Sequence, residues 1–223
     1  MTLTDRQKEI LDGIVEEYIR LARPISSQFL EEEYDFGFSP ATIRNEMLSL
    51  SEQGFLEKPY LSSGRVPTDQ GYRFFVDEIL QEGNGQQEAF EWESPLELAR
   101  RLNSFTSALA TLYLPSQNIV LKEGWESVLE EPEFSNPFAS RSFAKFIKDF
   151  EEYVPEIPSG FAMNIFIGKE NPFSKMEDFS IMIAECDIGG TKGFVALAGP
   201  KRMAYKKNIK ALKSVKHGRR KIH

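Results

Sequence analysis

The chain has 223 residues, 41% of them hydrophobic, and a formal net charge of −7, which is compatible with one large or two small folded domains and excludes global disorder. Its single cysteine excludes an internal disulfide, and both histidines lie in the last seven residues, so neither a nucleophilic pair nor a metal site is favoured. We expect a protein that is not an enzyme and has no cofactor. The start lacks an apolar signal region and no apolar run can span a bilayer, so we expect cytoplasmic localisation and no membrane contact.

Charge is distributed unevenly along the chain. Residues 1–80 hold 8 basic and 15 acidic residues (net −7), residues 81–200 hold 9 and 19 (net −10), and residues 201–223 hold 10 and none (net +10). The acidic body argues against broad nucleic-acid affinity, whereas the basic C-terminal segment favours it. Charge alone therefore does not decide whether the protein binds DNA.

The first part of the chain carries a succession of helix patterns. Thr4 and Gln7 have the form of a capping box, and apolar residues at helical spacing behind them predict a helix over residues 5–21. A second, short helix is expected after Ser26 or Ser27, and a glycine turn follows it.

The third helix has the form of a recognition helix. In "SPATIRNEMLSLSEQG", Ser39 is a good N-cap and Gly54 is a natural stop. A short helix, a glycine turn and a capped helix have helix-turn-helix spacing. When the apolar stripe of this helix faces the core, its outward and flanking faces carry Thr42, Arg44, Asn45 and Ser49. Arg and Asn can bind guanine and adenine edges, and Ser39 at the helix N-terminus can meet a phosphate; the alternative is a surface helix that merely bears these residues.

A hairpin is predicted next. "FLEKPYLSSGRVP" contains two short extended runs around a Ser-Ser-Gly turn, which places Arg65 at the tip of the hairpin. An arginine on such a protrusion can enter a minor groove or contact phosphates, whereas the alternative is a solvated turn arginine. Thr68 then caps a further helix. The helix-turn-helix and the hairpin together favour DNA binding.

The remaining residues predict a second unit of helices and strands. Residues 81–95 are polar, contain two glycines and are interpreted as a linker. A helix is predicted from Pro95 to Tyr113, with further helical pieces at 126–134 and 141–153. Strands are expected in "FAMNIFIG", "FSIMIAEC" and "GFVALAG", followed by a basic helix over about 203–215.

Several of these stretches resemble one protein family. "LTDRQKEILDGIVEEYI", "FSPATIRNEMLSLSEQGFLEKP" and "SSGRVPTDQGYRFFVD" resemble the winged-helix domain of the heat-inducible transcription repressors of the HrcA type. "LARRLNSFTSALATLYLP", "EGWESVLEEPEF", "IFIGKENPF" and "GPKRMAY" are similar to the C-terminal domain of that family. The resemblance implies an α+β protein: a winged helix-turn-helix domain at 1–80, a linker at 81–95, a truncated GAF-like α/β regulatory and dimerisation domain with an antiparallel sheet at 96–215, and a basic tail at 216–223.

The second domain is expected to be shortened. Between Pro115 and Asn118 the family normally carries the first strands of the sheet and an inserted domain associated with dimerisation, whereas only two residues stand there in this chain. The resemblance therefore implies a sheet that lacks its first strands and pairs its exposed edge with a partner chain. The basic ending is unlike the usual apolar ending of the family and is expected to add salt-dependent affinity for DNA.

The family resemblance implies a repressor of heat-shock (chaperone) genes. Such a protein binds an inverted-repeat operator in double-stranded DNA as a homodimer, and its activity depends on a chaperonin. Thr42, Arg44 and Asn45 would contact bases. The residues expected to contact or position the DNA backbone are Ser39, Lys58, Ser62, Ser63, Gly64, Arg65 and Tyr72.

Two other functions remain open. "DIGGTK" resembles the phosphate loop of a sugar kinase, as found in some sugar-sensing winged-helix regulators, but only 33 residues follow Gly190, too few to complete a nucleotide cleft. In its place in the chain, the segment is better explained as a hairpin turn in which Gly189 and Gly190 supply positive φ. The other alternative is a winged helix that binds protein, which the negative charge of residues 1–80 supports. Cys186 is interpreted as a buried small hydrophobe.

Overall fold

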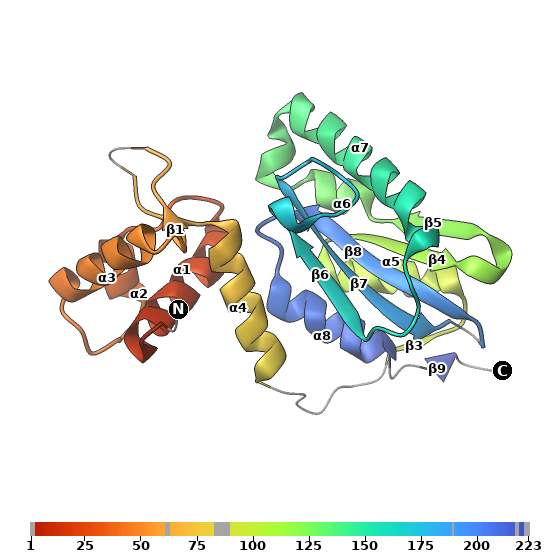
Figure 1. The fold of residues 1–223 in the computed structure, drawn as a ribbon, viewed down its shortest axis with the longest axis horizontal. Helices are drawn as coiled ribbons and strands as arrows, with labels where there is room; N and C mark the ends of the chain where they lie inside the picture. Colours follow the sequence, from red (N-terminus) through yellow and green to blue (C-terminus); the bar gives the residue numbers. More distant parts are fainter. Residues whose placement is uncertain (1–2, 61–62, 83–89, 189, 217–218, 221–223) are drawn as a thin grey trace. The chain divides into compact units, whose positions relative to one another are not determined.

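A computed structural model of the chain describes residues 3–60, 63–82, 90–188, 190–216 and 219–220. The chain divides into two compact units, unit 1 (residues 1–83) and unit 2 (residues 84–223) (Figure 1). Both contain helices and strands, which confirms an α+β protein. None of the described helices combines the length and the hydropathy needed to cross a bilayer.

Unit 1 consists of helices and one short antiparallel ladder. Helix α3 packs against α1 and α2, and α4 packs against α1. In the ladder, Leu56 pairs with Pro67 and Glu57 pairs with Val66. The described elements in chain order are α1 (Asp5–Leu21), α2 (Ser27–Glu33), α3 (Pro40–Glu52), β1 (Leu56–Glu57), β2 (Val66–Pro67) and α4 (Asp69–Gln81).

Hydrogen bonds confirm the predicted helix starts in unit 1. Gln7 N donates to Thr4 Oγ1 (3.3 Å) and Thr4 N donates to Gln7 Oε1 (3.1 Å), which completes the capping box of α1. Ser39 and Thr68 each accept a hydrogen bond from the backbone N–H three residues later, at the starts of α3 and α4. Gly54, with φ of +85°, follows the end of α3. These local bonds fix the helix ends because the terminal backbone groups have no partner within the helix.

The loop between β1 and β2 is anchored at its base to the connection between α1 and α2. Ile25 N donates to Arg65 O (2.9 Å), and Arg65 N donates to Ile25 O (2.8 Å). Gly64 precedes this bridge, and a Cβ at its position would lie 2.1 Å from Ile25 O. The two backbones approach so closely that only glycine fits at residue 64.

Unit 2 is built on a five-stranded antiparallel sheet with the strand order β5-β4-β8-β7-β6. Helix α7 covers one face of the sheet, and α5 and α8 cover the other (Figure 1). The described elements are β3 (Glu91–Trp92), α5 (Pro95–Thr106), β4 (Leu109–Leu114), η1 (Pro115–Gln117), β5 (Ile119–Glu123), α6 (Trp125–Leu129), η2 (Pro132–Ser135), α7 (Pro137–Tyr153), η3 (Val154–Glu156), β6 (Met163–Ile167), η4 (Gly168–Glu170), β7 (Phe179–Asp187), β8 (Lys192–Pro200), α8 (Tyr205–Lys216) and β9 (Arg219–Arg220).

Aromatic side chains fill the space between α7 and the sheet. Phe143, Phe146 and Phe150 recur at helical spacing on α7 and are buried. The ring of Phe143 lies 5.1 Å from that of Phe179 on β7 and 5.2 Å from that of Phe134, measured between centroids. These rings form a continuous hydrophobic core with the strands beneath them.

The helix predicted over residues 95–113 is wrong in its last part. Helix α5 ends at Thr106, Ser107 adopts a left-handed φ of 59°, and the chain then enters β4. All residues of β4 are buried. A run that is apolar on every side has no periodicity that distinguishes a strand from a helix.

The prediction that the sheet lacks its first strands is also wrong. Strands β4 and β5 lie on either side of Pro115–Gln117, which forms a single 3₁₀ turn. They pair with each other from Ala110 with Glu123 to Leu114 with Ile119. Strand β4 also pairs with β8, so it lies inside the sheet.

The segment interpreted as a linker contributes its C-terminal end to unit 2. Trp92 in β3 is buried, and Phe90 N donates to Ser214 O (3.2 Å). The backbone of Arg219–Arg220, within the expected basic tail, pairs in parallel with β3. These contacts join residues far apart in the chain, and the polar composition of the two segments does not indicate them.

The "DIGGTK" segment joins β7 and β8 in an antiparallel hairpin, as predicted. Gly190 N donates to Asp187 Oδ1 (2.6 Å), Ile188 N donates to Thr191 O (2.8 Å), and Gly190 has φ of +87°. Gly189 lies outside the described residues. A strand follows the turn directly, whereas a phosphate loop leads into the N-terminus of a helix.

Candidate nucleic-acid interface

Helix α3 turns a polar side away from the core of unit 1. Ile43, Met47 and Leu50 are buried, whereas Arg44 and Asn45 are exposed, as the helical spacing predicts. Within the described part of the chain, neither Arg44 nor Asn45 has a side-chain hydrogen bond or an ion pair. Their donors and acceptors are therefore open to a binding partner.

The N-terminus of α3 carries two hydroxyl groups. Ser39 Oγ accepts a hydrogen bond from Thr42 N (3.2 Å) and lies 2.9 Å from Thr42 Oγ1. Ser39 is exposed and Thr42 is half-buried. The first N–H groups of a helix also carry partial positive charge, so this end of α3 favours an anionic group.

The eight basic residues of residues 1–80 fall into two groups. One group is neutralised by carboxylates, in the pairs Arg6–Glu46, Lys8–Glu78, Arg20–Glu17 and Arg73–Asp77. The other group has no carboxylate within ion-pair distance among the described residues, and consists of Arg23, Arg44, Lys58 and Arg65. These residues lie on α3, on the β1–β2 loop and on the α1–α2 connection to which that loop is anchored. Residues 1–80 have a net negative charge, yet their four basic side chains without a carboxylate partner among the described residues lie on three connected elements of unit 1.

Arg65 lies at the base of the β1–β2 loop, immediately before Val66 of β2. The expected position at the tip of a hairpin is therefore wrong. Its backbone bonds to Ile25, and its Nε donates to Ser51 Oγ of α3 (2.8 Å), so Arg65 connects the loop to α3. Ser62, another predicted contact residue, lies outside the described residues.

The described part of the β1–β2 loop contains a hydrogen-bonded turn. Ser63 Oγ donates to Tyr60 O (2.8 Å) and accepts from Tyr60 N (3.0 Å). Ser63 is therefore engaged within the loop. Lys58 and Tyr60 are exposed and extend into solvent.

Tyr72 is separated from the other predicted contact residues. Its side chain is only 1% exposed, on the same buried side of α4 as Phe75 and Val76. A side chain buried to this extent cannot touch a phosphate. Tyr72 can affect DNA binding only by holding α4 in place.

Arg23 was not predicted as a candidate contact. It is exposed, and its guanidinium carbon lies 5.6 Å from the centroid of the Phe29 ring. In the sequence, the only signal at Arg23 is its position before Pro24, which marks the end of the first helix. Its place near the loop depends on the bridge between Ile25 and Arg65, a contact between residues far apart in the chain.

Unit 2 offers little for catalysis. The described residues contain no group of three or more His, Cys, Asp or Glu side chains placed to hold a metal ion. Cys186 near the end of β7 is buried, and this burial, with smaller contributions from Asp187 and Glu185, raises the pKa of its thiol to about 12. A thiol with that pKa is almost fully protonated at neutral pH and is a poor nucleophile.

We expect Cys186 to stay unreactive toward a disulfide reagent such as DTNB at pH 8 in the folded protein. In guanidinium chloride it should react fully, because unfolding removes the burial that raises its pKa. The absorbance of the released thiolate measures the reaction, and the single cysteine makes the signal unambiguous. Rapid reaction of the folded protein would contradict the buried position.

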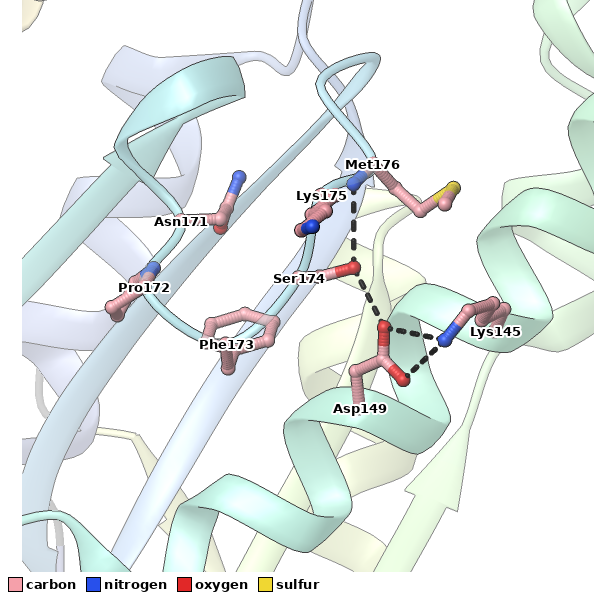
Figure 2. Close-up of a pocket in the computed structure, with 8 residues that line it drawn as sticks. All are labelled: Lys145, Asp149, Asn171, Pro172, Phe173, Ser174, Lys175 and Met176. Atoms are coloured by element: carbon pink, nitrogen blue, oxygen red, sulfur yellow. Dashed lines mark hydrogen bonds and ion pairs between the residues drawn. The ribbon is translucent and has the colours of Figure 1, made fainter.

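A pocket of about 460 Å³ lies in unit 2 between α7 and the segment 171–176 (Figure 2). Asp149 in its wall accepts hydrogen bonds from Lys145 Nζ (2.8 Å) and Ser174 Oγ (2.8 Å). Burial raises the pKa of Asp149, but the hydrogen bonds from Lys145 and Ser174 outweigh it and leave the pKa below its ordinary value. A paired, ionised carboxylate is a poor general acid.

Comparison with known proteins connects the chain to one family. A family model described as "HrcA protein C terminal domain" matches residues 76–209. A protein of Halalkalibacterium halodurans named "Heat-inducible transcription repressor HrcA" is 56% identical over 78 residues, which cover 35% of this chain and 23% of that protein. A protein of the same name from Acetivibrio thermocellus is 35% identical over 136 residues, 58% of this chain and 39% of that protein. The matches thus span well under half the length of these curated relatives.

One solved structure has the same fold. It is described as "Crystal structure of a hypothetical protein at 2.2 A resolution" and superposes with a TM-score of 0.79, covering 95% of this chain and 96% of that chain. The two sequences are 21% identical. At this identity the similarity establishes the shared fold alone.

Proposed function

Because the chain belongs to the HrcA family, we propose that it is a DNA-binding repressor of heat-shock genes and not an enzyme. The observation that carries the proposal is the placement of charge in unit 1. Among its described residues, the four basic side chains without a carboxylate partner all lie on α3, the β1–β2 loop and the segment anchored to that loop. A DNA-binding protein must neutralise phosphates, and these side chains are available to do so.

Residues 1–80 act in this proposal as a winged helix-turn-helix domain. Helix α3 enters the major groove, where Arg44 contacts guanine and Asn45 contacts adenine, with Thr42 beside them. Ser39 and the N-terminus of α3 meet a phosphate. The β1–β2 loop is the wing, and its contacts to the DNA backbone come from Lys58, Ser62, Ser63 and Arg65, with Gly64 allowing the loop to stay anchored.

The assembly and its regulation are further parts of the proposal. Two copies bind the two halves of an inverted repeat, because a two-fold symmetric protein matches a palindromic operator. In this proposal, unit 2 is a GAF-like regulatory and dimerisation domain. Its antiparallel sheet, covered by helices, supports this assignment. The name of the relatives, which describes them as heat-inducible repressors, supports a response to heat. The proposal further includes action in the cytoplasm and dependence of the activity on a chaperonin.

Replacing Arg44 by alanine should remove most of the preference for the operator. A bidentate contact to guanine contributes about 1–3 kcal/mol of discrimination, so the ratio of operator to random-sequence affinity should fall roughly 5- to 150-fold. The operator is first selected by the full chain from a random duplex library. Gel-shift titrations of the selected and random duplexes at two salt concentrations then measure the ratio.

The matched control is Arg141→Ala, since Arg141 is an exposed arginine on α7 in unit 2. It removes the same charge and should leave the ratio unchanged. An unchanged ratio in Arg44→Ala would show that Arg44 does not contact a base. If the unmodified chain binds no duplex at all, unit 1 is a protein-binding module instead. Calorimetric binding of ATP with magnesium would support the kinase-like alternative.

A further inference from the structure

Helix α8 is basic on the side that faces away from the sheet. Residues 201–223 hold ten basic residues and no acidic residue. The buried side chains of α8 include Tyr205, Asn208, Ile209, Leu212 and Val215. On its other side α8 carries a lysine face, defined here as Lys207, Lys210 and Lys213, of which the first two are exposed and the third is half-buried. Spacings of three residues on a helix with 3.6 residues per turn keep these lysines on adjoining positions.

The lysine face is not neutralised by neighbouring carboxylates. None of its three ammonium groups has an ion pair within the described part of the chain. The closest-packed helix, α5, carries Glu97, but this carboxylate binds Arg101 (2.7 Å) and the backbone N–H of Glu93 (2.8 Å). Lys206 is engaged with another group and is left out of the lysine face for that reason. The charge of these lysines is therefore available to a partner with negative charge.

Aromatic rings lie beside the lysine face. The Nζ atom of Lys207 is 5.2 Å from the centroid of the Phe105 ring on α5, and Phe90 packs edge-on against Phe105 at 6.0 Å. The cation–π contact positions the stem of Lys207 while its N–H donors stay open to solvent. The basic positions 219–220 belong to the same unit, because β9 pairs with β3.

We propose that the lysine face of α8 binds the phosphate backbone of duplex DNA as a second, sequence-independent contact surface. The inference rests on the proposed function, which supplies the duplex. The three lysines span about 9 Å along the helix axis, and each strand of duplex DNA carries one phosphate per about 3.4 Å of the duplex axis, so a stretch of one backbone of this length offers about three phosphates. A row of ammonium groups without a pocket matches a line of phosphates and has no means of selecting a base.

The test compares two triple variants of the full chain with the same net charge. The first is Lys207→Gln/Lys210→Gln/Lys213→Gln. The control is Lys148→Gln/Lys169→Gln/Lys192→Gln, whose side chains are 72–82% exposed elsewhere in unit 2. Fluorescence polarisation measures binding to the selected operator and to a random duplex of equal length over a series of salt concentrations.

We expect the lysine-face variant to lower the slope of log K against log salt concentration by up to about 2.7, or about 0.9 for each phosphate that the protein no longer neutralises. The slope should fall equally for both duplexes, so the preference for the operator stays the same, unlike in Arg44→Ala. The control should keep the slope of the unmodified chain.

Equal slopes in the two triple variants would overturn this inference while leaving the proposed function intact. Absence of duplex binding by the unmodified chain would instead overturn the proposed function. Binding of fluorescent polyglutamate is measured in parallel. If the lysine-face variant no longer binds polyglutamate but keeps its DNA slope, the surface binds an acidic protein and the DNA inference is wrong.

Discussion

Replacing Phe143 by alanine is expected to lower the free energy of unfolding of unit 2 by about 3–5 kcal/mol. Phe143 is 0% exposed, and its ring packs against those of Trp125, Phe134 and Phe179. Removing it deletes buried apolar surface and leaves a cavity that the surrounding rings can only partly fill. Urea unfolding followed by tryptophan fluorescence measures the effect, because both tryptophans lie in unit 2.

The matched control lies on the same helix. Phe138 is 72% exposed near the start of α7, and Phe138→Ala should change the free energy of unfolding by no more than about 0.5 kcal/mol. Both substitutions remove the same atoms, so the difference between them isolates burial. Equal unfolding midpoints for the two variants would show that the aromatic cluster does not stabilise unit 2.

Replacing Gly64 by alanine should detach the β1–β2 loop from the rest of unit 1. The new Cβ would lie 2.1 Å from Ile25 O and 2.8 Å from Ser26 N, and backbone atoms cannot rotate out of the way. The two hydrogen bonds between Ile25 and Arg65 would break, each contributing about 0.5–1.5 kcal/mol. Hydrogen–deuterium exchange should show loss of protection at both amides. Gel shifts should show affinity for the operator reduced by about tenfold or more.

Gly199→Ala is the control for this substitution. A Cβ at residue 199 would meet its nearest neighbours at 3.7 Å, which is ordinary van der Waals contact. It should leave amide protection and DNA affinity unchanged. If Ile25 and Arg65 remain protected in Gly64→Ala, the anchored loop is not held in the way the structure indicates.

The elements of unit 1 are largely predictable because their signals are local. Thr4, Ser39 and Thr68 cap helices through hydrogen bonds to residues three positions away, and Gly54 ends α3 through its own positive φ. Burial on α3 also follows from helical spacing, so the exposure of Arg44 could be predicted without any knowledge of the rest of the fold.

The parts that could not be predicted depend on contacts between distant residues. Both faces of β4 are buried, so its sequence lacks the alternation of apolar and polar residues that would distinguish a strand from a helix. Its pairing with β5 and β8 makes it a strand. The pairing of β3, which contains the buried Trp92, with residues 219–220 also joins distant parts of the chain. In the candidate interface, the bridge between Ile25 and Arg65 decides the positions of Arg23 and Arg65. By contrast, the spacing of Tyr72, Phe75 and Val76 on α4 is that of one helix face, so the burial of Tyr72 could have been predicted from the sequence.

The order of strands in unit 2 has a consequence for its synthesis on the ribosome. Strand β8 lies between β4 and β7, and Leu109 of β4 pairs with Ala198, which stands 89 positions later in the chain. The centre of the sheet therefore cannot close until translation has passed β8. Until then β4, apolar on both faces, emerges without one of its two neighbouring strands. An exposed apolar strand is prone to aggregation, from which chaperones protect a folding chain, and this fits the regulation proposed for the protein.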